Sequence, residues 1–301
     1  MKLRVFSTLV VVLVFSLLAV SARAGTISLG TAEPYAVIAQ TLVSNVTTFG
    51  DTVITGNVGI SPSGSCTGFI PVACGSASAG TINGTLNINN GASASALFDA
   101  EAAETALLGT VIPAPINETG TDLGSLSPLA PGIYYFTTDA QLTGALTLAA
   151  GGNLSPVWIF EMSSKLTTAS NSSVTVTDTT GGAGAAAAGV YWVVGSQAIL
   201  GSDTLFLGNI LAETNISFLP GAQDTCGRAF ADTSVTFAGD NPAAQGGMPN
   251  VVSDTCTQSP SGFSGGSGGA TPEPGTLALF SSGLLAMVFL AFRKSRVSPL
   301  I

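Results

Sequence analysis

The 301-residue chain contains no histidine, and charged residues make up only 8% of it. Histidine is the usual proton shuttle at neutral pH and the commonest metal ligand, so its absence argues against acid–base catalysis and against a metal site. Of the eight lysines and arginines, six lie near the two ends of the chain, which leaves Lys165 and Arg228 between them. All 17 acidic residues lie between residues 25 and 292, so this body carries 2 − 17 = −15 charges. Such a surface repels phosphate backbones and excludes nucleic acid as a partner.

The scarcity of ionisable side chains also argues against an enzyme. Polysaccharide lyases use a cationic base, for which only Lys165 and Arg228 are available. Glycosidases need two carboxylates that flank a cleft, whereas Asp99, Glu101 and Glu104 cluster on a predicted helix, where a solvated face or an ion pair is expected. No G-x-S-x-G motif with a partner base occurs. We therefore predict a non-catalytic protein, in which Arg228 forms a structural ion pair.

Cysteine occurs only four times, at Cys66, Cys74, Cys226 and Cys256. In an exported protein an even number indicates disulfides, and four cysteines allow three pairings. Cys66 and Cys74 would close a short local loop, which favours this pair together with Cys226–Cys256. A zinc site is the alternative, but the chain has neither histidine nor C-x-x-C spacing. We predict disulfides, with no metal and no other cofactor.

Long apolar runs occur only at the two ends of the chain. At the N-terminus, Lys2 and Arg4 precede an apolar segment from Leu9 to Val20, and Ala22-Arg23-Ala24 forms a small-x-small cleavage site. This order is typical of a secretory signal peptide. The segment is too short for a convincing permanent membrane span. We predict that residues 1–24 are a signal peptide and that cleavage follows Ala24.

At the C-terminus, residues 275–292 contain no charged residue and have about the length that crosses a bilayer core. Arg293, Lys294 and Arg296 follow at once and would keep this end in the cytoplasm. Residues 257–270 are rich in Gly and Ser and predict a flexible linker. We therefore expect a transmembrane segment at 275–292, with a plain membrane anchor as the simplest interpretation.

The triplet Pro272-Glu273-Pro274 stands directly before this segment. Triplet, apolar span and basic end together make residues 271–301 resemble a PEP-CTERM sorting signal. In that family an exosortase in the membrane recognises and removes the tail. The resemblance implies an exported protein at the cell surface or in the extracellular matrix, anchored to the membrane only transiently through its tail.

Between the two ends, residues 25–256 form a body that is long enough for one large domain. Short apolar segments recur between Gly, Ser, Asn and Asp residues, and each predicts a short strand. Such strands suit a solenoid that turns after every strand. Examples are Val157–Phe160, Val174–Val176, Val190–Val194, Leu205–Leu207, Ile210-Leu211 and Ile216–Phe218.

One segment of the body predicts a helix instead. Residues 92–109 are rich in Ala and have no Gly or Pro before Gly109. Leu97, Phe98 and Leu108 would form its apolar face, although Glu101 falls among them. Such a helix is expected to pack along the side of the solenoid rather than to stand alone.

The body resembles the ice-binding-protein-like family of bacteria and fungi over roughly residues 31–240. The resemblance rests on an ordered set of segments, none of which is specific alone. It implies a mainly β fold, a right-handed parallel β-helix with one α-helix packed alongside. The segments are Ile54–Pro62 (ITGNVGISP), Leu129–Tyr134 (LAPGIY), Val157–Phe160 (VWIF), Leu166–Ser170 (LTTAS), Val190–Ser196 (VYWVVGS), Gly208–Ala212 (GNILA) and Gly227–Ala229 (GRA).

The resemblance also implies ice or an ordered water surface as the partner, and ice binding needs a flat, rigid array rather than a reactive group. In a β-helix, rungs lie about 4.8 Å apart and alternate residues on a strand about 6.7 Å apart. Thr suits such an array because a stiff side chain carries both a methyl and a hydroxyl group. The predicted outward residues in the first two rungs are Thr143, Ala145 and Thr147, then Thr167, Ala169 and Asn171.

The next two predicted rungs depart from the pattern of Thr, a small residue, then Thr or Asn. The third is Ile199, Gly201 and Asp203, and the fourth is Ser217, Leu219 and Gly221. From these rungs we retain Gly201 and Ser217 as candidate ice-binding residues. A shift of one residue would turn the opposite side of every strand outward.

Two other interpretations stay open on the sequence. A Thr-rich strand face is often only the solvated side of a β-helix. The protein could also be a non-catalytic adhesin of the cell surface that keeps the scaffold without ice activity, with extracellular polysaccharide as its partner.

Overall fold

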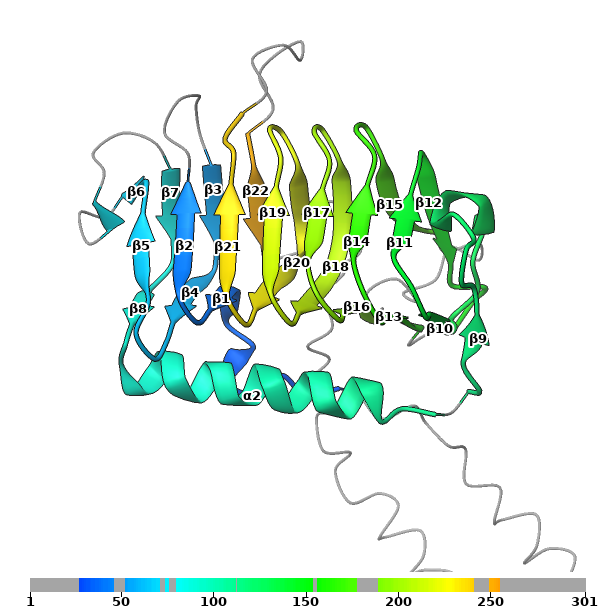
Figure 1. The fold of residues 1–301 in the computed structure, drawn as a ribbon, viewed down its shortest axis with the longest axis horizontal. Helices are drawn as coiled ribbons and strands as arrows, with labels where there is room; N and C mark the ends of the chain where they lie inside the picture. The colour runs from blue at the N-terminus through cyan, green and yellow to red at the C-terminus, as the bar shows by residue number, and fades with distance from the viewer. Residues whose placement is uncertain are drawn as a thin grey trace, which may run out of the picture. The chain divides into compact units, whose positions relative to one another are not determined.

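The computed structural model describes residues 27–45, 52–70, 74–75, 80–111, 113–153, 156–177, 189–240 and 249–254. Parallel strands coil into a three-sided rod, and one long helix lies along one side (Figure 1). The predicted parallel β-helix with one helix alongside is confirmed. The signal peptide, the linker 257–270, the sorting tail with Pro272-Glu273-Pro274 and the segment 275–292 lie outside the described residues. In the described parts of the chain, no helix is long and apolar enough to cross a bilayer.

The rod has three faces, named here the seven-stranded face, the helix-covered face and the third face. The seven-stranded face is one continuous parallel sheet. Its strands, in spatial order, are β11 (Ala140–Leu142), β14 (Leu166–Thr168), β17 (Ala198–Leu200), β19 (Asn215–Phe218), β21 (Ser234–Phe237), β2 (Leu42–Asn45) and β5 (Ser65–Thr67).

The other two faces share a second sheet, because β18 (Leu205–Ala212) and β20 (Gln223–Ala231) bend round the corner between them. The C-terminal halves of β18 and β20 lie on the helix-covered face with β9 (Ile116–Asn117), β10 (Gly132–Phe136), β13 (Val157–Met162), β16 (Gly189–Val194), β1 (Tyr35–Ala39), β4 (Asn57–Ile60) and β8 (Leu86–Ile88). Their N-terminal halves lie on the third face with β12 (Ala145–Ala149), β15 (Ser173–Thr177), β22 (Val251–Ser253), β3 (Thr52–Thr55), β7 (Gly80–Asn83) and β6 (Phe69–Ile70).

The rungs are not stacked in the order of the sequence. Strand β1 pairs with β20 on one side and with β4 on the other, and β2 lies between β21 and β5. The first described coil therefore lies in the middle of the rod, and the following strands coil outward to β8. It then returns along the rod through α2 (Gly91–Leu108) and coils inward from β9 to β22 (Figure 1).

Aliphatic and aromatic side chains from all three faces fill the interior. Aromatic rings stack from rung to rung, with centroid distances of 4.0 Å between Phe160 and Trp192 and 4.8 Å between Phe218 and Phe237. Such stacks bury large rings in fixed positions. They hold successive rungs in register and make the outer faces rigid.

Helix α2 begins at a capping box, in which the Asn90 side chain accepts a hydrogen bond from the Ser93 amide and the Ser93 side chain accepts one from the Asn90 amide. Its bounds agree with the prediction to within one residue. The predicted apolar face is wrong for two of its three residues, since Phe98 is 70% exposed and Leu108 52% exposed, whereas Leu97 is partly buried against the rod. Small side chains face the rod instead, which lets the helix backbone approach it closely; they are Ser93, Ala96, Ala100 and Ala103, with Leu107 at the end.

The disulfide between Cys66 and Cys74 is present, as predicted. Cys226 is also disulfide-bonded, and no described cysteine is free. Cys256 is the only cysteine left to pair with Cys226, and it lies outside the described residues.

Two short 3-10 helices, η1 (Gly30–Ala32) and η3 (Leu123–Leu126), complete the described elements. The segments Leu205–Leu207 and Ile210-Leu211, predicted as two strands, form the single strand β18.

Candidate functional site

The seven-stranded face carries a straight column of outward side chains through its centre. Thr167 pairs with Ile199, and Ile199 pairs with Ser217, as the sequence predicted for the second to fourth rungs. The same column continues in one register over all seven strands. Its members are Gln141, Thr167, Ile199, Ser217, Thr236, Ser44 and Thr67. Five of these seven side chains are Ser or Thr, and none is charged.

Side-chain hydrogen bonds hold this surface in place. The Thr236 hydroxyl donates to Ser217 Oγ at 3.1 Å, and the Ser234 hydroxyl donates to Asn215 Oδ1 at 2.9 Å. Both bonds run from one rung to the next. The neighbouring inward residues are buried at Leu166, Ala198, Ile216 and Val235. The hydroxyl groups therefore repeat at the rung spacing, about 4.8 Å, on a base that cannot bend easily.

The alignment predicted for the first rung is wrong. Gln141 pairs with Thr167, whereas Thr143 was expected there. Thr143 lies two residues later, at the exposed corner where the chain leaves the seven-stranded face. Ala145 and Thr147 lie beyond this corner on the third face, where they pair with Ser173 and Thr175. The corner after β11 is shorter than those of the next rungs, since Leu142 and Ala145 are three residues apart.

The outermost residues of the next three predicted rungs are turn residues. Asn171, Asp203 and Gly221 have φ values of 60°, 58° and 76°, in the left-handed region. Asn, Asp and Gly tolerate this region better than other residues do. They occupy the corner between the seven-stranded face and the third face. Asp203 therefore lies beside the seven-stranded face and not on its plane, where the predicted third rung had placed it.

The middle residues of these rungs lie at the border of the seven-stranded face. Ala169 is partly exposed, and Leu219 is 39% exposed. Gly201 is buried, and a Cβ atom there would meet the backbone oxygen of Thr168 at 2.5 Å. Gly201 therefore serves the close packing of two rungs and presents no side chain outward.

Ser44, Thr67 and Thr236, which extend the column on β2, β5 and β21, were not predicted from the sequence. A signal for them was present. Val235-Thr236-Phe237 repeats the alternation of Ile216-Ser217-Phe218, with a hydroxyl residue between two buried apolar ones. In β2 and β5 only the first half of this pattern is present, because Asn45 and Gly68 follow Ser44 and Thr67 in place of an apolar residue. Because the rungs are stacked out of sequence order, this likeness alone does not reveal that these strands are neighbours.

The third face offers a smaller and less regular array. Ala145, Thr147 and Ala149 pair with Ser173, Thr175 and Thr177 on two five-residue strands. The next rung brings Leu205 into this column, where it is 43% exposed. The register then shifts between β18 and β20. Large apolar side chains and the shift in register interrupt this Thr-bearing array after its first two strands.

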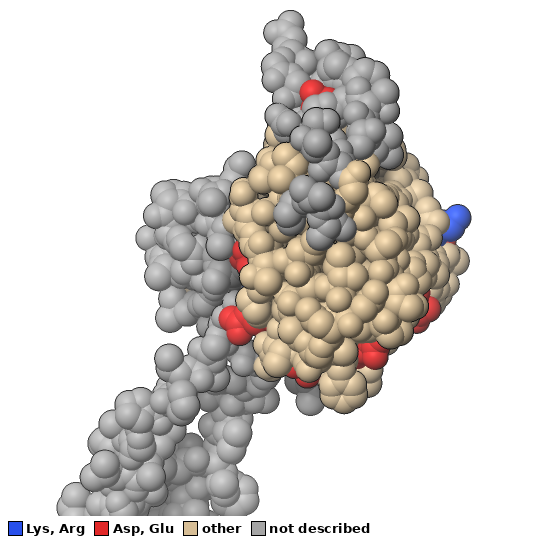
Figure 2. Space-filling model, turned by 90° about the vertical axis from the view of Figure 1, so that its left-hand side faces the viewer, with Lys and Arg blue, Asp and Glu red and all other residues tan. Residues whose placement is uncertain are grey.

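Ionised groups border the seven-stranded face but do not enter its central column. The Asp139 carboxylate accepts a hydrogen bond from the Lys165 amide at 3.2 Å. A hydrogen bond with the Ser164 side chain and, after it, this bond from the Lys165 amide lower the pKa of Asp139. Figure 2 looks along the rod from the left of Figure 1 and shows acidic atoms of the described residues mainly along the lower rim, where α2 lies.

A cluster of carboxylates lies where α2 meets the rod. Burial and the nearby carboxylates of Asp232, Glu213 and Glu101 raise the pKa of Glu104 to about 7. Burial also raises the pKa of Asp232. No group of three or more His, Cys, Asp or Glu side chains within the described ranges could hold a metal ion.

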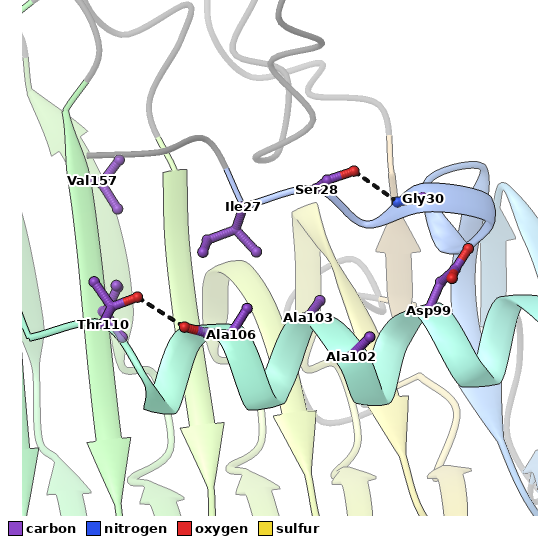
Figure 3. A pocket seen from close by; sticks show the side chains of 10 residues that line it. Ile27, Ser28, Gly30, Asp99, Ala102, Ala103, Ala106, Thr110 and Val157 are labelled. Atoms are coloured by element: carbon purple, nitrogen blue, oxygen red, sulfur yellow. Dashed lines mark hydrogen bonds between the residues drawn. The ribbon is translucent and has the colours of Figure 1, made fainter. Parts of the chain in front are cut away.

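A cavity of about 420 Å³ lies on the other side of α2, beneath the N-terminal segment (Figure 3). Ile27, Ala103, Ala106 and Ile159 contribute apolar walls. At one end the Asp99 carboxylate accepts hydrogen bonds from the Thr31 amide at 2.6 Å and hydroxyl at 2.7 Å, and these bonds lower its pKa. Asp99 thus attaches η1 to the helix.

The Arg228 guanidinium is buried and makes structural contacts. It donates to the Asn209 side chain at 3.1 Å and to the backbone oxygen of Glu33. Burial lowers its pKa, while Asp254, Glu33 and Asp224 oppose that shift. Arg228 thus has a structural role, as the sequence predicted, through hydrogen bonds to a backbone oxygen and a side-chain amide, and nearby carboxylates act on it electrostatically.

Two family models match the chain. The model described as ice-binding-like matches residues 37–241, and the model of the PEP-CTERM protein-sorting motif matches residues 270–296. The first covers most of the rod. The second contains Pro272, Glu273 and Pro274, as the sequence predicted.

Relatives and solved structures agree with these matches. The chain is 36% identical over 293 residues to an ice-binding protein of Nostoc sp. (strain HG1), covering 97% of this chain and 96% of the relative. It is 31% identical to ice-binding protein K3-B1 of Typhula ishikariensis, over 70% and 87% of the two chains. The crystal structure of an ice-binding protein from Antarctomyces psychrotrophicus aligns with a TM-score of 0.59 at 30% identity, over 75% and 97% of the two chains.

Proposed function

Because the chain belongs to the ice-binding-like family, we propose that it binds ice, and that it does so through the seven-stranded face. The observation that supports this choice is the central column, with Ser or Thr at five of seven positions in one unbroken register. The named relatives are described as ice-binding proteins, which favours ice over the matrix-adhesin alternative.

The physical basis of binding is a match between two repeating surfaces. Hydroxyl groups at about 4.8 Å intervals can hydrogen-bond to ordered water, and the Thr methyl groups order the water between them. A rigid array loses little entropy when it docks. The stacked rings beneath the face and the hydrogen bonds along it supply this rigidity. Bound to a growing crystal, the protein would block further growth and recrystallisation.

The sorting motif supports export and placement at the cell surface. In this proposal residues 1–24 are removed on export, and an exosortase later acts on the tail that contains Pro272-Glu273-Pro274. The segment 275–292 holds the chain in the membrane until then. The protein carries out no catalysis and uses no cofactor.

A pair of matched substitutions tests the choice of face. Thr167→Tyr places a bulky ring on the seven-stranded face, and Thr175→Tyr places the same ring on the third face of the same coil. We expect Thr167→Tyr to abolish ice shaping and recrystallisation inhibition, and Thr175→Tyr to preserve both. Both side chains point outward, so the free energy of unfolding should change by only about 0.5 kcal/mol.

If Thr175→Tyr abolishes ice shaping and recrystallisation inhibition while Thr167→Tyr preserves both, the ice-binding site lies on the third face. An unsubstituted protein that neither shapes ice nor inhibits recrystallisation would refute ice binding itself.

A further inference from the structure

A column of buried side chains runs along the rod just inside the corner between the seven-stranded face and the third face. On the third face one register joins Ser173, Leu205, Gln223, Val251 and Val53. The residue before each of them therefore has the same place in its coil, and these residues form what we call the corner column. Its members, all buried, are Ser172, Thr204, Ala222, Asn250 and Thr52. Four of the five are polar, although aliphatic and aromatic side chains fill most of the interior.

Hydroxyl groups of the corner column link neighbouring coils. The Ser172 hydroxyl donates to the Leu142 oxygen at 3.0 Å, across to the coil before it. In the next coil the Thr204 hydroxyl donates to the Ala169 oxygen at 3.2 Å. A hydroxyl group has one proton to donate, so Thr168 is the donor in the 2.8 Å contact between the Thr168 and Thr204 hydroxyls. Thr204 is thus bonded twice to the preceding coil.

Asn250 has the same place two coils further along, and its longer side chain serves the position where Ala222 offers no polar group. The Asn250 Nδ2 donates to the oxygens of Leu219 and Ala222 at 2.8 Å and 2.9 Å. Its Oδ1 accepts a hydrogen bond from the Gly239 amide at 2.6 Å. One side chain therefore holds the corners that follow β19 and β21.

These bonds act on the border of the seven-stranded face. Ala169 and Leu219, whose oxygens accept from the corner column, stand two residues after Thr167 and Ser217 of the central column. A hydrogen bond requires a defined distance and angle, whereas contacts between aliphatic side chains tolerate several arrangements. A buried polar group is costly unless its bonds form with this geometry. The corner column therefore sets where each corner lies relative to the preceding coil.

We propose that the corner column positions the ice-binding array, so that Ser172, Thr204 and Asn250 are positioning residues of a site that none of them touches; this rests on the proposed function. Ice is a fixed lattice, and the outward hydroxyl groups fit it only while they lie in one plane. When one link is lost, the coil stays folded but its corner can shift, and the outward residues of that strand leave the common plane. A site whose supporting residues are about 1 Å too loose loses much of its activity.

Thr204→Val tests this role, because valine resembles threonine in shape but has no hydroxyl group. The Thr168 hydroxyl then lacks its acceptor, and the Ala169 oxygen lacks this donor. We expect recrystallisation inhibition to require about fivefold more of the full chain carrying Thr204→Val. The assay is run near the melting point of ice, where circular dichroism checks that the variant is folded. Thr204→Ser keeps the hydroxyl group and should keep the activity.

Ser93→Ala is the matched control, on the helix-covered face. The Ser93 hydroxyl is buried like that of Thr204, and it too accepts one hydrogen bond and donates one, both with Asn90. Its removal should lower the melting temperature about as much as Thr204→Val does. Recrystallisation inhibition should nevertheless stay unchanged, because the helix does not support the seven-stranded face.

Two results would overturn the inference. Thr204→Val could lower the melting temperature and keep full inhibition, or Ser93→Ala could lose as much inhibition as Thr204→Val; in either case the corner column serves stability alone. Should Thr204→Val not fold, Ser172→Ala takes its place with the same expected loss, and full inhibition in that variant would count equally against the inference. If the unsubstituted protein does not inhibit recrystallisation, the proposed function itself fails, and this inference with it.

Discussion

The Arg228 guanidinium donates two hydrogen bonds to the backbone oxygen of Glu33, from Nε at 3.0 Å and from Nη2 at 2.8 Å. The two residues are 195 positions apart in the sequence. Glu33 lies in the turn before β1, the first strand of the chain, and Arg228 lies in β20 in the last full coil. This contact joins the first described coil to the last full one, at the level where the two series of coils meet.

Replacing Arg228 by Lys tests this junction. A lysine keeps the charge but cannot bridge Glu33 and Asn209 with a planar fork of donors. The free energy of unfolding should fall by about 2 kcal/mol or more, because buried acceptors lose their partners. Thermal unfolding of the full chain would measure the loss. A stability equal to that of the unsubstituted protein would show that the junction does not depend on these bonds.

Ile199 interrupts the hydroxyl column between Thr167 and Ser217, and its replacement by Thr should improve ice binding. The change adds a hydroxyl group at an outward, partly exposed position and keeps a β-branched side chain there. Recrystallisation inhibition should then occur at a severalfold lower concentration, with stability within about 0.5 kcal/mol. Thr175→Ile on the third face provides the opposite exchange as a control. If Ile199→Thr inhibits recrystallisation less well than the unsubstituted protein, the apolar contact of Ile199 with ice matters more than a hydroxyl group at this position.

Asn171 is expected to act through the backbone turn and not through contact with ice. Its φ of 60° is costly for a β-branched residue. Asn171→Thr should therefore lower the free energy of unfolding by about 1–2 kcal/mol, while Asn171→Gly should be nearly neutral. Chemical denaturation of both variants compares them directly. If Asn171→Gly stays stable but loses ice shaping, the side chain belongs to the ice-binding site after all.

The rod should be more stable in mild acid than in mild base because of Glu104. Its pKa rises from the ordinary 4.5 to about 7 on folding, so the folded state binds more protons between these values. Stability therefore increases as the pH falls from above 7 toward 4.5. After allowance for solvent screening, the expected gain is about 1 kcal/mol. Asp232 shifts in the same direction.

Thermal unfolding at about pH 5.5 and about pH 8, on either side of the raised pKa, measures this effect. In Glu104→Gln the difference between the two pH values should shrink, and the stability at the higher pH should rise. Asp139→Asn is a suitable control, because the pKa of this exposed carboxyl is lowered and it is ionised at both pH values. An unchanged pH dependence in Glu104→Gln would assign it to other carboxyl groups.

Much of the fold could be predicted from local sequence, because each coil repeats the same short alternation of apolar and polar residues. The register of Thr167, Ile199 and Ser217 was predicted correctly for this reason. Their coils also have corners of equal length, as the positive φ angles at Asn171, Asp203 and Gly221 show. The first rung was misaligned because its corner is two residues shorter than the corners of the next rungs. The sequence of the strand itself does not indicate this difference.

The remaining errors concern contacts between distant parts of the chain. The pairing of β2 with β21 joins strands that are far apart in the sequence, and nothing in either strand specifies its partner. The packed side of α2 was misassigned because its contact with the rod uses Ala, while Phe98 and Leu108 face outward. A close approach of backbones, and not the burial of large side chains, determines how this helix lies.

The out-of-order stacking of coils has a consequence for biosynthesis. Strand β1 is among the first made, yet one of its neighbours, β20, is complete only after residue 231 has been synthesised. Until then one edge of the first coils stays unpaired, and unpaired parallel edges are prone to aggregate. Contacts over such sequence separations also make folding slow. The coils from β10 to β20 are stacked in sequence order and can form one after another, but the rod is complete only when the last coil docks on the first.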